Sequence, residues 1–151
     1  MPIHTWEARF SLRWMLALAV LTGCAALSSC RSSEQSLNLA KQSVVQFHAQ
    51  LDAEMYPAIY AAADEKFHQA TSQEDMTKFL SAVHRKLGTV QDAQLTNTGV
   101  AWFAGQGATV TLIYSTKFSE GSGTERFVWH IKDNAATLYN YNIQSNELVT
   151  K

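Results

Sequence analysis

Cysteine, charge and long apolar runs are all scarce in this sequence, and each scarcity excludes a class of protein. Both cysteines lie within the first thirty residues, so the rest of the chain carries no thiol. The formal net charge is -1 and the basic residues are scattered without a polybasic patch, which leaves no overall field that attracts nucleic acid. No apolar run reaches the roughly 20 residues that a helix needs to span a bilayer.

Sequence motifs of common enzymes are missing as well. The chain has no glycine-rich phosphate loop, no HExxH, no paired CxxC and no GxSxG. We therefore expect a protein that is not an enzyme and that holds neither a cofactor nor a metal ion. With 151 residues, 46% of them hydrophobic, the chain is nevertheless long enough for one domain with its own core.

The N-terminus has the order of features that is typical of an export signal. Arg9 and Arg13 precede an uninterrupted apolar run over residues 14–21, which has the length of a signal-peptide core. The sequence Leu-Thr-Gly-Cys follows at residues 21–24 and resembles the lipobox of bacterial lipoproteins. This resemblance implies cleavage before Cys24, a diacylglyceryl thioether on its sulfur and an acyl group on the new amine. Several acyl chains, at about 0.8 kcal/mol per buried methylene, anchor a protein to a membrane.

Cys30 leaves a second cleavage site open. Residues 27–30 read Leu-Ser-Ser-Cys, a less complete copy of the pattern, and cleavage there removes Cys24 with the signal peptide. A third reading is a secreted protein without lipid whose two cysteines pair. We favour Cys24, because Gly23 precedes it directly and the pattern abuts the apolar run.

Lipidation at Cys24 divides the chain into a signal peptide over residues 1–23, a flexible tether over residues 24–35 and one domain over residues 36–151. The tether is serine-rich and has few large apolar side chains. The lipobox resemblance implies export and a lipid anchor in the bacterial cell membrane. In a bacterium with two membranes, Ala25 after the lipidated cysteine indicates the outer membrane, facing the periplasm.

Apolar residues recur at three- and four-residue steps in two segments, which predicts two amphipathic helices. The first covers residues 37–55, and Pro57 is expected to bend the chain and start a further helical segment. The second is expected to end at Gly88, and its apolar stripe contains Met76, Phe79, Leu80, Val83 and Leu87.

A capping box precedes the second helix in either of two registers. Thr71 pairs with Glu74 in one register, and Ser72 pairs with Asp75 in the other. Both place a hydroxyl three residues before an acid, so the sequence leaves the choice open.

After Gly88 the hydrophobic period changes to two, which predicts strands. We expect them near residues 89–103, 108–118, 124–132 and 136–144, separated by turn-forming residues. Consecutive hairpins give an antiparallel meander. Helices followed by a meander predict an α+β fold, with the helices packed on one face of a bent sheet of about four strands.

The phrases FHAQLDAEMYPAIYAAADEKF, FLSAVHRKLGTV and LYNYNIQS resemble small bacterial proteins of unknown function. Those proteins have the cone-shaped fold shared by nuclear-transport-factor-two-like, ketosteroid-isomerase-like and cystatin-like proteins. The resemblance spans roughly residues 36 to 146 and implies this fold. It does not imply an activity, because the fold hosts enzymes, binding modules and scaffolds.

His48 and Asp52 are the first candidates for chemistry. They lie four residues apart on the first predicted helix, where a carboxylate can orient an imidazole as a general base. The alternative, which we favour, is a surface pair beside the apolar stripe.

Other histidines and aromatic residues offer weaker candidates. His130 and Arg126 share one face of the third predicted strand, opposite its aromatic residues, and are expected on the solvated side of the sheet. His68 and His84 have no further ligand at a spacing that suits a metal. Tyr139 to Asn142 alternate two tyrosines with two amides, so one face of the fourth strand is expected to be polar. We favour simple packing for these aromatic residues. Contact of that face with a protein or glycan is the alternative.

These observations favour a membrane-anchored lipoprotein whose domain is a non-enzymatic binding or assembly module at the cell envelope. Its expected partners are the membrane, through the acyl chains, and an envelope protein. A carrier of a small apolar ligand in a helix–sheet cavity is the second reading, and a cavity enzyme of the ketosteroid-isomerase-like type is the third.

Overall fold

The computed structural model describes residues 33–150. The described residues from Ser36 onward form one compact unit. The expected signal peptide, Cys24 and Cys30 lie outside the described residues. Within the described range no helix is both long and apolar enough to cross a bilayer.

Helices come first in the described part of the chain and strands follow. Residues 33–52 form the first of these helices, which we call the first helix, and its opening residues fall within the expected tether. The later elements are α2 Tyr56–Ala61, α3 Glu65–Ala70, α4 Gln73–Leu87, β1 Val90–Phe103, β2 Gly107–Phe118, β3 Ser122–Lys132, β4 Ala135–Gln144 and α5 Glu147–Thr150.

The strands form one antiparallel sheet in the order β1-β2-β3-β4, and their ranges confirm the predicted meander. The β1–β2 turn depends on Gly107, which has φ +89° and whose added Cβ would lie 2.2 Å from the carbonyl oxygen of Ile131. Asp133 and Asn134 both have positive φ in the β3–β4 turn, as expected for residues that tolerate the left-handed region.

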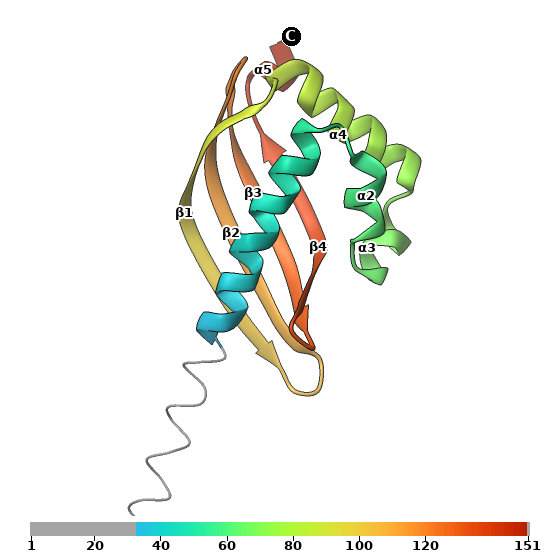
Figure 1. The fold of residues 1–151 in the computed structure, drawn as a ribbon, viewed down its shortest axis with the longest axis vertical. Coiled ribbons are helices and arrows are strands. Elements are labelled where there is room, and N and C mark those ends of the chain that lie inside the picture. Colours follow the sequence, from blue (N-terminus) through green and yellow to red (C-terminus); the bar gives the residue numbers. More distant parts are fainter. Residues whose placement is uncertain (1–32, 151) are drawn as a thin grey trace, which may run out of the picture. The chain divides into compact units, whose positions relative to one another are not determined.

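The helices lie on one face of the bent sheet, which confirms the α+β expectation (Figure 1). The first helix buries Ala40, Val44, Phe47 and Leu51 on one side. The ring of Phe47 meets that of Phe127 edge to face, with centroids 5.1 Å apart. Such aromatic pairs contribute about 0.5–1.5 kcal/mol beyond the area that they bury.

Helix α4 has the ends that the sequence predicts. The side chain of Ser72 accepts a hydrogen bond from the amide of Asp75, so the second capping register is the one adopted. Gly88 ends the helix with φ +78°. Phe79 departs from the predicted apolar stripe, because it is exposed, although its ring still lies 5.9 Å from that of Tyr141.

The segment after Pro57 differs from the expected single restart. Helix α2 starts at Tyr56 with Pro57 in its first turn and ends at Ala61, and the chain then leaves the helix to pair Ala63 with Leu138 of β4. Asp64 caps the new helix α3 by accepting a hydrogen bond from the amide of Lys66. The break depends on a contact with β4, more than seventy residues away, which local periodicity does not report.

Candidate functional site

His48 does not form the expected pair with Asp52. It is buried, with 7% of its surface exposed, and its Nε2 lies 2.8 Å from Oε2 of Glu125 on β3. Asp52 instead accepts a hydrogen bond from the backbone amide of Val90 at 3.0 Å. Both readings of this pair, the general base and the surface pair, are therefore wrong.

Glu125 is the centre of a closed polar cluster between the first helix and the sheet. Its side chain is fully buried. Oε2 accepts from the hydroxyl of Thr116 and is bound by His48, and Oε1 accepts from the hydroxyl of Tyr141 at 2.7 Å. A buried carboxylate is costly unless such donors replace water. The cluster therefore ties the first helix to three strands.

The charge of Glu125 also affects the neighbouring phenols. Burial raises the pKa of Tyr141 well above its ordinary value, and the negative charge of Glu125 raises it further. Burial and the same carboxylate raise the pKa of Tyr114. Both phenols therefore stay protonated at neutral pH, and Tyr141 acts as a hydrogen-bond donor.

The sequence contained a signal for Glu125 that our reading did not use. Glu125 shares its strand face with Phe127, Trp129 and Ile131, which are the residues predicted to pack on the helices. An acid at the end of an apolar face predicts a buried carboxylate that needs donors from other elements.

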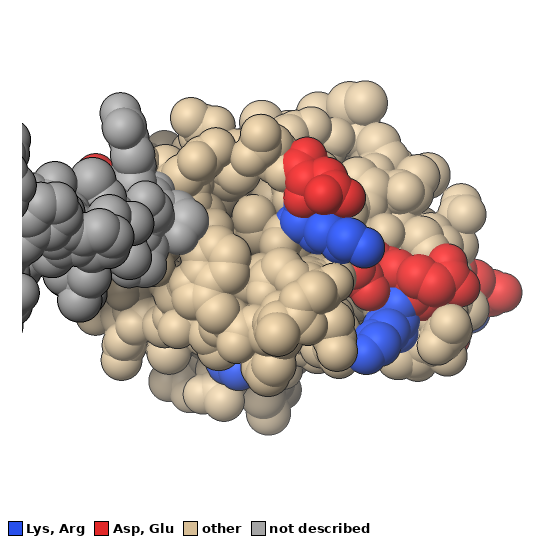
Figure 2. Space-filling view, turned by 90° about the horizontal axis from the view of Figure 1, so that it is seen from below, with Lys and Arg blue, Asp and Glu red and all other residues tan. Residues whose placement is uncertain are grey.

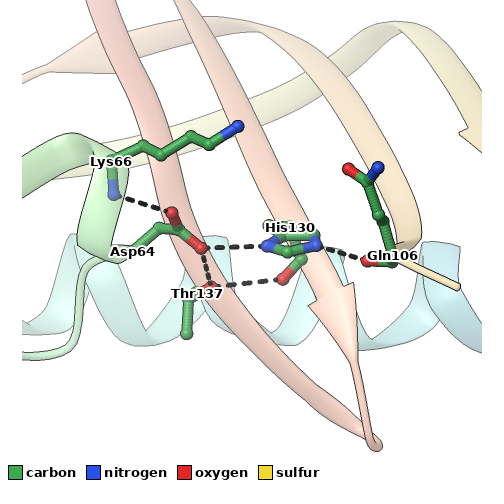
Figure 3. Close-up of polar contacts among 5 residues, drawn as sticks. All are labelled: Asp64, Lys66, Gln106, His130 and Thr137. Atoms are coloured by element: carbon green, nitrogen blue, oxygen red, sulfur yellow. Dashed lines mark hydrogen bonds and ion pairs between the residues drawn. The ribbon is translucent and has the colours of Figure 1, made fainter. Parts of the chain in front are cut away.

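His130 belongs to a second cluster, on the opposite face of the sheet. Nδ1 lies 2.9 Å from Oδ2 of Asp64, and Nε2 lies 2.7 Å from the carbonyl oxygen of Gln106 (Figure 3). The carbonyl oxygen and the ionised carboxylate are both acceptors, so the ring satisfies both contacts only when it donates from both nitrogens as an imidazolium. The hydrogen bonds with Asp64 and Gln106 raise the pKa of His130 above 6.5, and the negative charge of Asp64 contributes to the shift.

Asp64 completes this arrangement, which we call the His130 clamp: Asp64, His130 and the carbonyl of Gln106. Burial raises the pKa of Asp64, but hydrogen bonds from His130, from the amide of Lys66 and from Thr137 outweigh it, so the pKa lies below its ordinary value. The Thr137 hydroxyl donates to Oδ2 at 3.2 Å. The clamp thus joins the start of α3, strand β3 and the β1–β2 turn.

An open pocket of about 530 Å³ lies over the clamp, and we call it the hairpin-end pocket. Phe103 and Tyr139 contribute aromatic surface to it and are 54% and 40% exposed. The remaining lining residues are Asp64, Lys66, Ala101, Gly105, Gln106, Thr109, His130 and Lys132. Figure 2 looks at this end of the molecule, where charged side chains gather to one side of a broad uncharged area.

Tyr139 reaches the pocket because β4 is irregular. A register shift lies between the pairs Val128–Asn140 and Trp129–Leu138, so Tyr139 is an extra residue opposite β3. Leu138 and Tyr141 are both buried while Tyr139 is exposed, which breaks the strict alternation that the sequence indicated.

The remaining candidate residues are dispersed. Arg126 is exposed on the same side of β3 as His130, as expected. Nε2 of His68 lies 2.7 Å from the carbonyl oxygen of Tyr60, and Nδ1 of His84 lies 3.9 Å from Glu54. In residues 33–150, no group of three or more histidine, cysteine or acidic side chains is placed to hold a metal ion.

Comparison with known proteins adds little to this description. No family model matches the chain, and no curated protein matches it either. Among solved structures, the chain is similar to a protein from Novosphingobium aromaticivorans that is named provisionally as a scytalone dehydratase. The TM-score is 0.49 at 8% sequence identity, over 76% of this chain and 87% of that one. This likeness carries no statement about the activity of the present chain.

Proposed function

We propose that this protein is an exported lipoprotein, anchored through Cys24, whose domain binds a ligand in the hairpin-end pocket without chemical catalysis. One observation carries the second half of the proposal: both ring nitrogens of His130 are engaged by acceptors. The first half rests on the Leu-Thr-Gly-Cys pattern at residues 21–24 behind an apolar run.

A histidine that acts as a general base needs a nitrogen with a free lone pair within reach of the substrate proton. Both ring nitrogens of His130 lie within hydrogen-bond distance of acceptors, Nδ1 of Asp64 and Nε2 of the carbonyl of Gln106, and these contacts raise its pKa and favour the doubly protonated ring. Glu125 is bound by the side chains of His48, Thr116 and Tyr141 and has no exposed surface. The geometry therefore favours a rigid binding surface over a reaction site.

The pocket lies at the same end of the domain as the start of the first helix. In Figure 1 the first helix begins at the lower end of the long axis, where the β1–β2 turn also lies. The stretch from Cys24 to residue 33 spans at most about 30 Å even when fully extended. An anchored domain therefore keeps this end close to the membrane, which raises the effective concentration of a partner in the envelope.

The carrier reading has less support. The pocket between the first helix, α2 and the sheet, lined by Phe47, Ile59, Trp129 and Leu138 among others, has a volume of about 50 Å³. Ligand pockets typically measure about 300–1,000 Å³, a range that includes the hairpin-end pocket.

Intact mass of the membrane-extracted protein tests the anchor. We expect a species that begins at Cys24 and carries diacylglyceryl and acyl mass, and we expect Cys24→Ser to abolish it while Cys30→Ser leaves it unchanged. An unmodified protein, or acylation at Cys30, contradicts the proposed anchor.

Photo-crosslinking in cells tests the pocket. p-Benzoylphenylalanine replaces Phe103 in one variant and Val45, which is 70% exposed on the first helix, in the control. We expect a discrete mass adduct at position 103 only, and its mass separates a small ligand from a protein. Equal adducts at both positions, or none at position 103, refute binding in this pocket.

A further inference from the structure

We propose that the hairpin-end pocket takes an organic anion with a flat apolar ring, the ring against Phe103 and Tyr139 and the anionic group at Lys66 and Lys132. This inference rests on the proposed function, since it names the ligand class of the same pocket.

The first support is the state of the two lysines. In residues 33–150, no hydrogen bond or ion pair engages the ammonium group of Lys66 or Lys132, which lie on α3 and at the end of β3. Two other lysines are engaged, since Lys78 contacts Glu74 and Lys86 donates to the carbonyl oxygen of Leu148 at 2.6 Å, whereas Lys117 is exposed and lies outside the pocket. The pocket therefore holds two cations without a counter-charge of their own.

The second support is the position of the acids. Asp64 lines the pocket, but its carboxylate is already paired with the imidazolium of His130 and accepts from Thr137 and from the amide of Lys66. Glu65 and Asp133, next to the two lysines in sequence, are not among the lining residues. Since the charges of Asp64 and His130 offset each other, an incoming ligand meets a net positive site that favours an anion.

The third support is the aromatic surface. Phe103 and Tyr139 are both largely exposed, and neither makes a ring–ring contact with another aromatic side chain in residues 33–150. Exposed aromatic faces in a concave site offer a large contact area to a flat apolar ligand. The register shift in β4, which turns Tyr139 outward, places this surface beside the lysines.

Three ligands that share one ring and differ in charge separate these contributions: benzoate, benzyl alcohol and benzylamine. We would titrate each into the membrane-extracted protein in detergent micelles and follow the NMR signals of Tyr139 and His130. We expect benzoate to shift both signals saturably, the alcohol to bind more weakly and the amine to cause no shift. Added salt is expected to weaken the binding of benzoate, because the lysines are exposed.

Matched variants locate the charge. Lys66→Gln with Lys132→Gln is expected to weaken benzoate binding at least about tenfold, which corresponds to the loss of two exposed ionic contacts. Lys117→Gln, which removes an exposed lysine of β2 that does not line the pocket, is expected to leave the affinity unchanged.

Binding of the alcohol or the amine as tight as that of benzoate refutes the inferred ligand class, and so does an unchanged affinity in the double variant. Absence of binding by all three ligands refutes it as well. The proposed function is read separately, because the crosslink at position 103 reports occupancy of the pocket without regard to the charge of the ligand.

Discussion

Replacing Asp64 by asparagine separates the ion pair of Asp64 with His130 from its role as the N-cap of α3. Asp64 caps α3 by accepting from the amide of Lys66. Asparagine caps a helix as well as aspartate does, so the change removes the negative charge and retains the cap. The effect on stability therefore reports the clamp rather than the helix.

The pH dependence follows from the two pKa directions. The pKa of His130 is raised, so the pair contributes its stabilisation below about pH 6.5 and loses it as the pH rises through the folded-state pKa. The pKa of Asp64 is lowered, so its contribution is present above about pH 3.9 and is lost as the pH falls through its lower folded-state value. Both groups are charged near pH 6, where the pair is strongest.

The size of the effect follows from the geometry. A hydrogen bond between charged groups contributes about 1.5–3 kcal/mol to stability. The side chains of His130 and Asp64 are 29% and 15% exposed, and solvent screening weakens the interaction, so we expect about 1–2 kcal/mol from this pair. Urea unfolding of Asp64→Asn should show this loss near pH 6 and a smaller loss once the pH has risen above the folded-state pKa of His130. Asp92→Asn, an exposed acid of β1, is the control and should change stability by less than about 0.5 kcal/mol at either pH. An equal loss at both pH values, or no loss at pH 6, refutes the clamp as described.

Three further predictions concern the fold that holds the pocket. His48→Leu leaves the buried carboxylate of Glu125 without its imidazole partner and should lower the free energy of unfolding in urea by about 3–5 kcal/mol. The double variant with Glu125→Leu should lower it by less than the sum of the two single changes. Additive losses would show that the two side chains are not coupled. Gly107→Ala places a Cβ against the carbonyl oxygen of Ile131 at a positive φ, so it should lower the free energy of unfolding by more than about 1 kcal/mol. Gly99→Ala is the control, because the space around its Cβ is open, and it should not lower the free energy of unfolding by this amount. Similar effects at both positions would contradict the turn geometry. Ser72→Ala should cost about 1 kcal/mol through the lost cap of α4, and an unchanged thermal midpoint argues against that cap.

Local patterns in the sequence were sufficient to predict the meander and α4. The alternation in β2 and β3 and the cap and glycine at the ends of α4 depend on residues within a few positions of each other, so their physics can be read locally. The same reasoning predicted the class of fold, because helices that precede a meander have one apolar face of a sheet on which to pack.

The polar clusters could not be predicted in this way. His48 lies 77 residues from Glu125, and Asp64 lies 66 residues from His130, so these pairs depend on strand register and on where the chain leaves α2. The register shift in β4 reverses the direction of Tyr139 without a glycine or proline to mark it. The spacing of His48 and Asp52 on one helix predicted the wrong pair, because His48 binds the buried carboxylate of Glu125 on β3 and Asp52 binds a backbone amide.

The account depends most on the protonation of His130, because a ring that donates from both nitrogens has no lone pair with which to act as a general base. Nitrogen-15 NMR of the histidine side chains in the membrane-extracted protein at pH 7 measures this directly. We expect His130 to carry protons on both Nδ1 and Nε2 and to lose one at a pH above the ordinary histidine pKa. A neutral ring with one unprotonated nitrogen at pH 7 would contradict the clamp and restore His130 as a candidate general base.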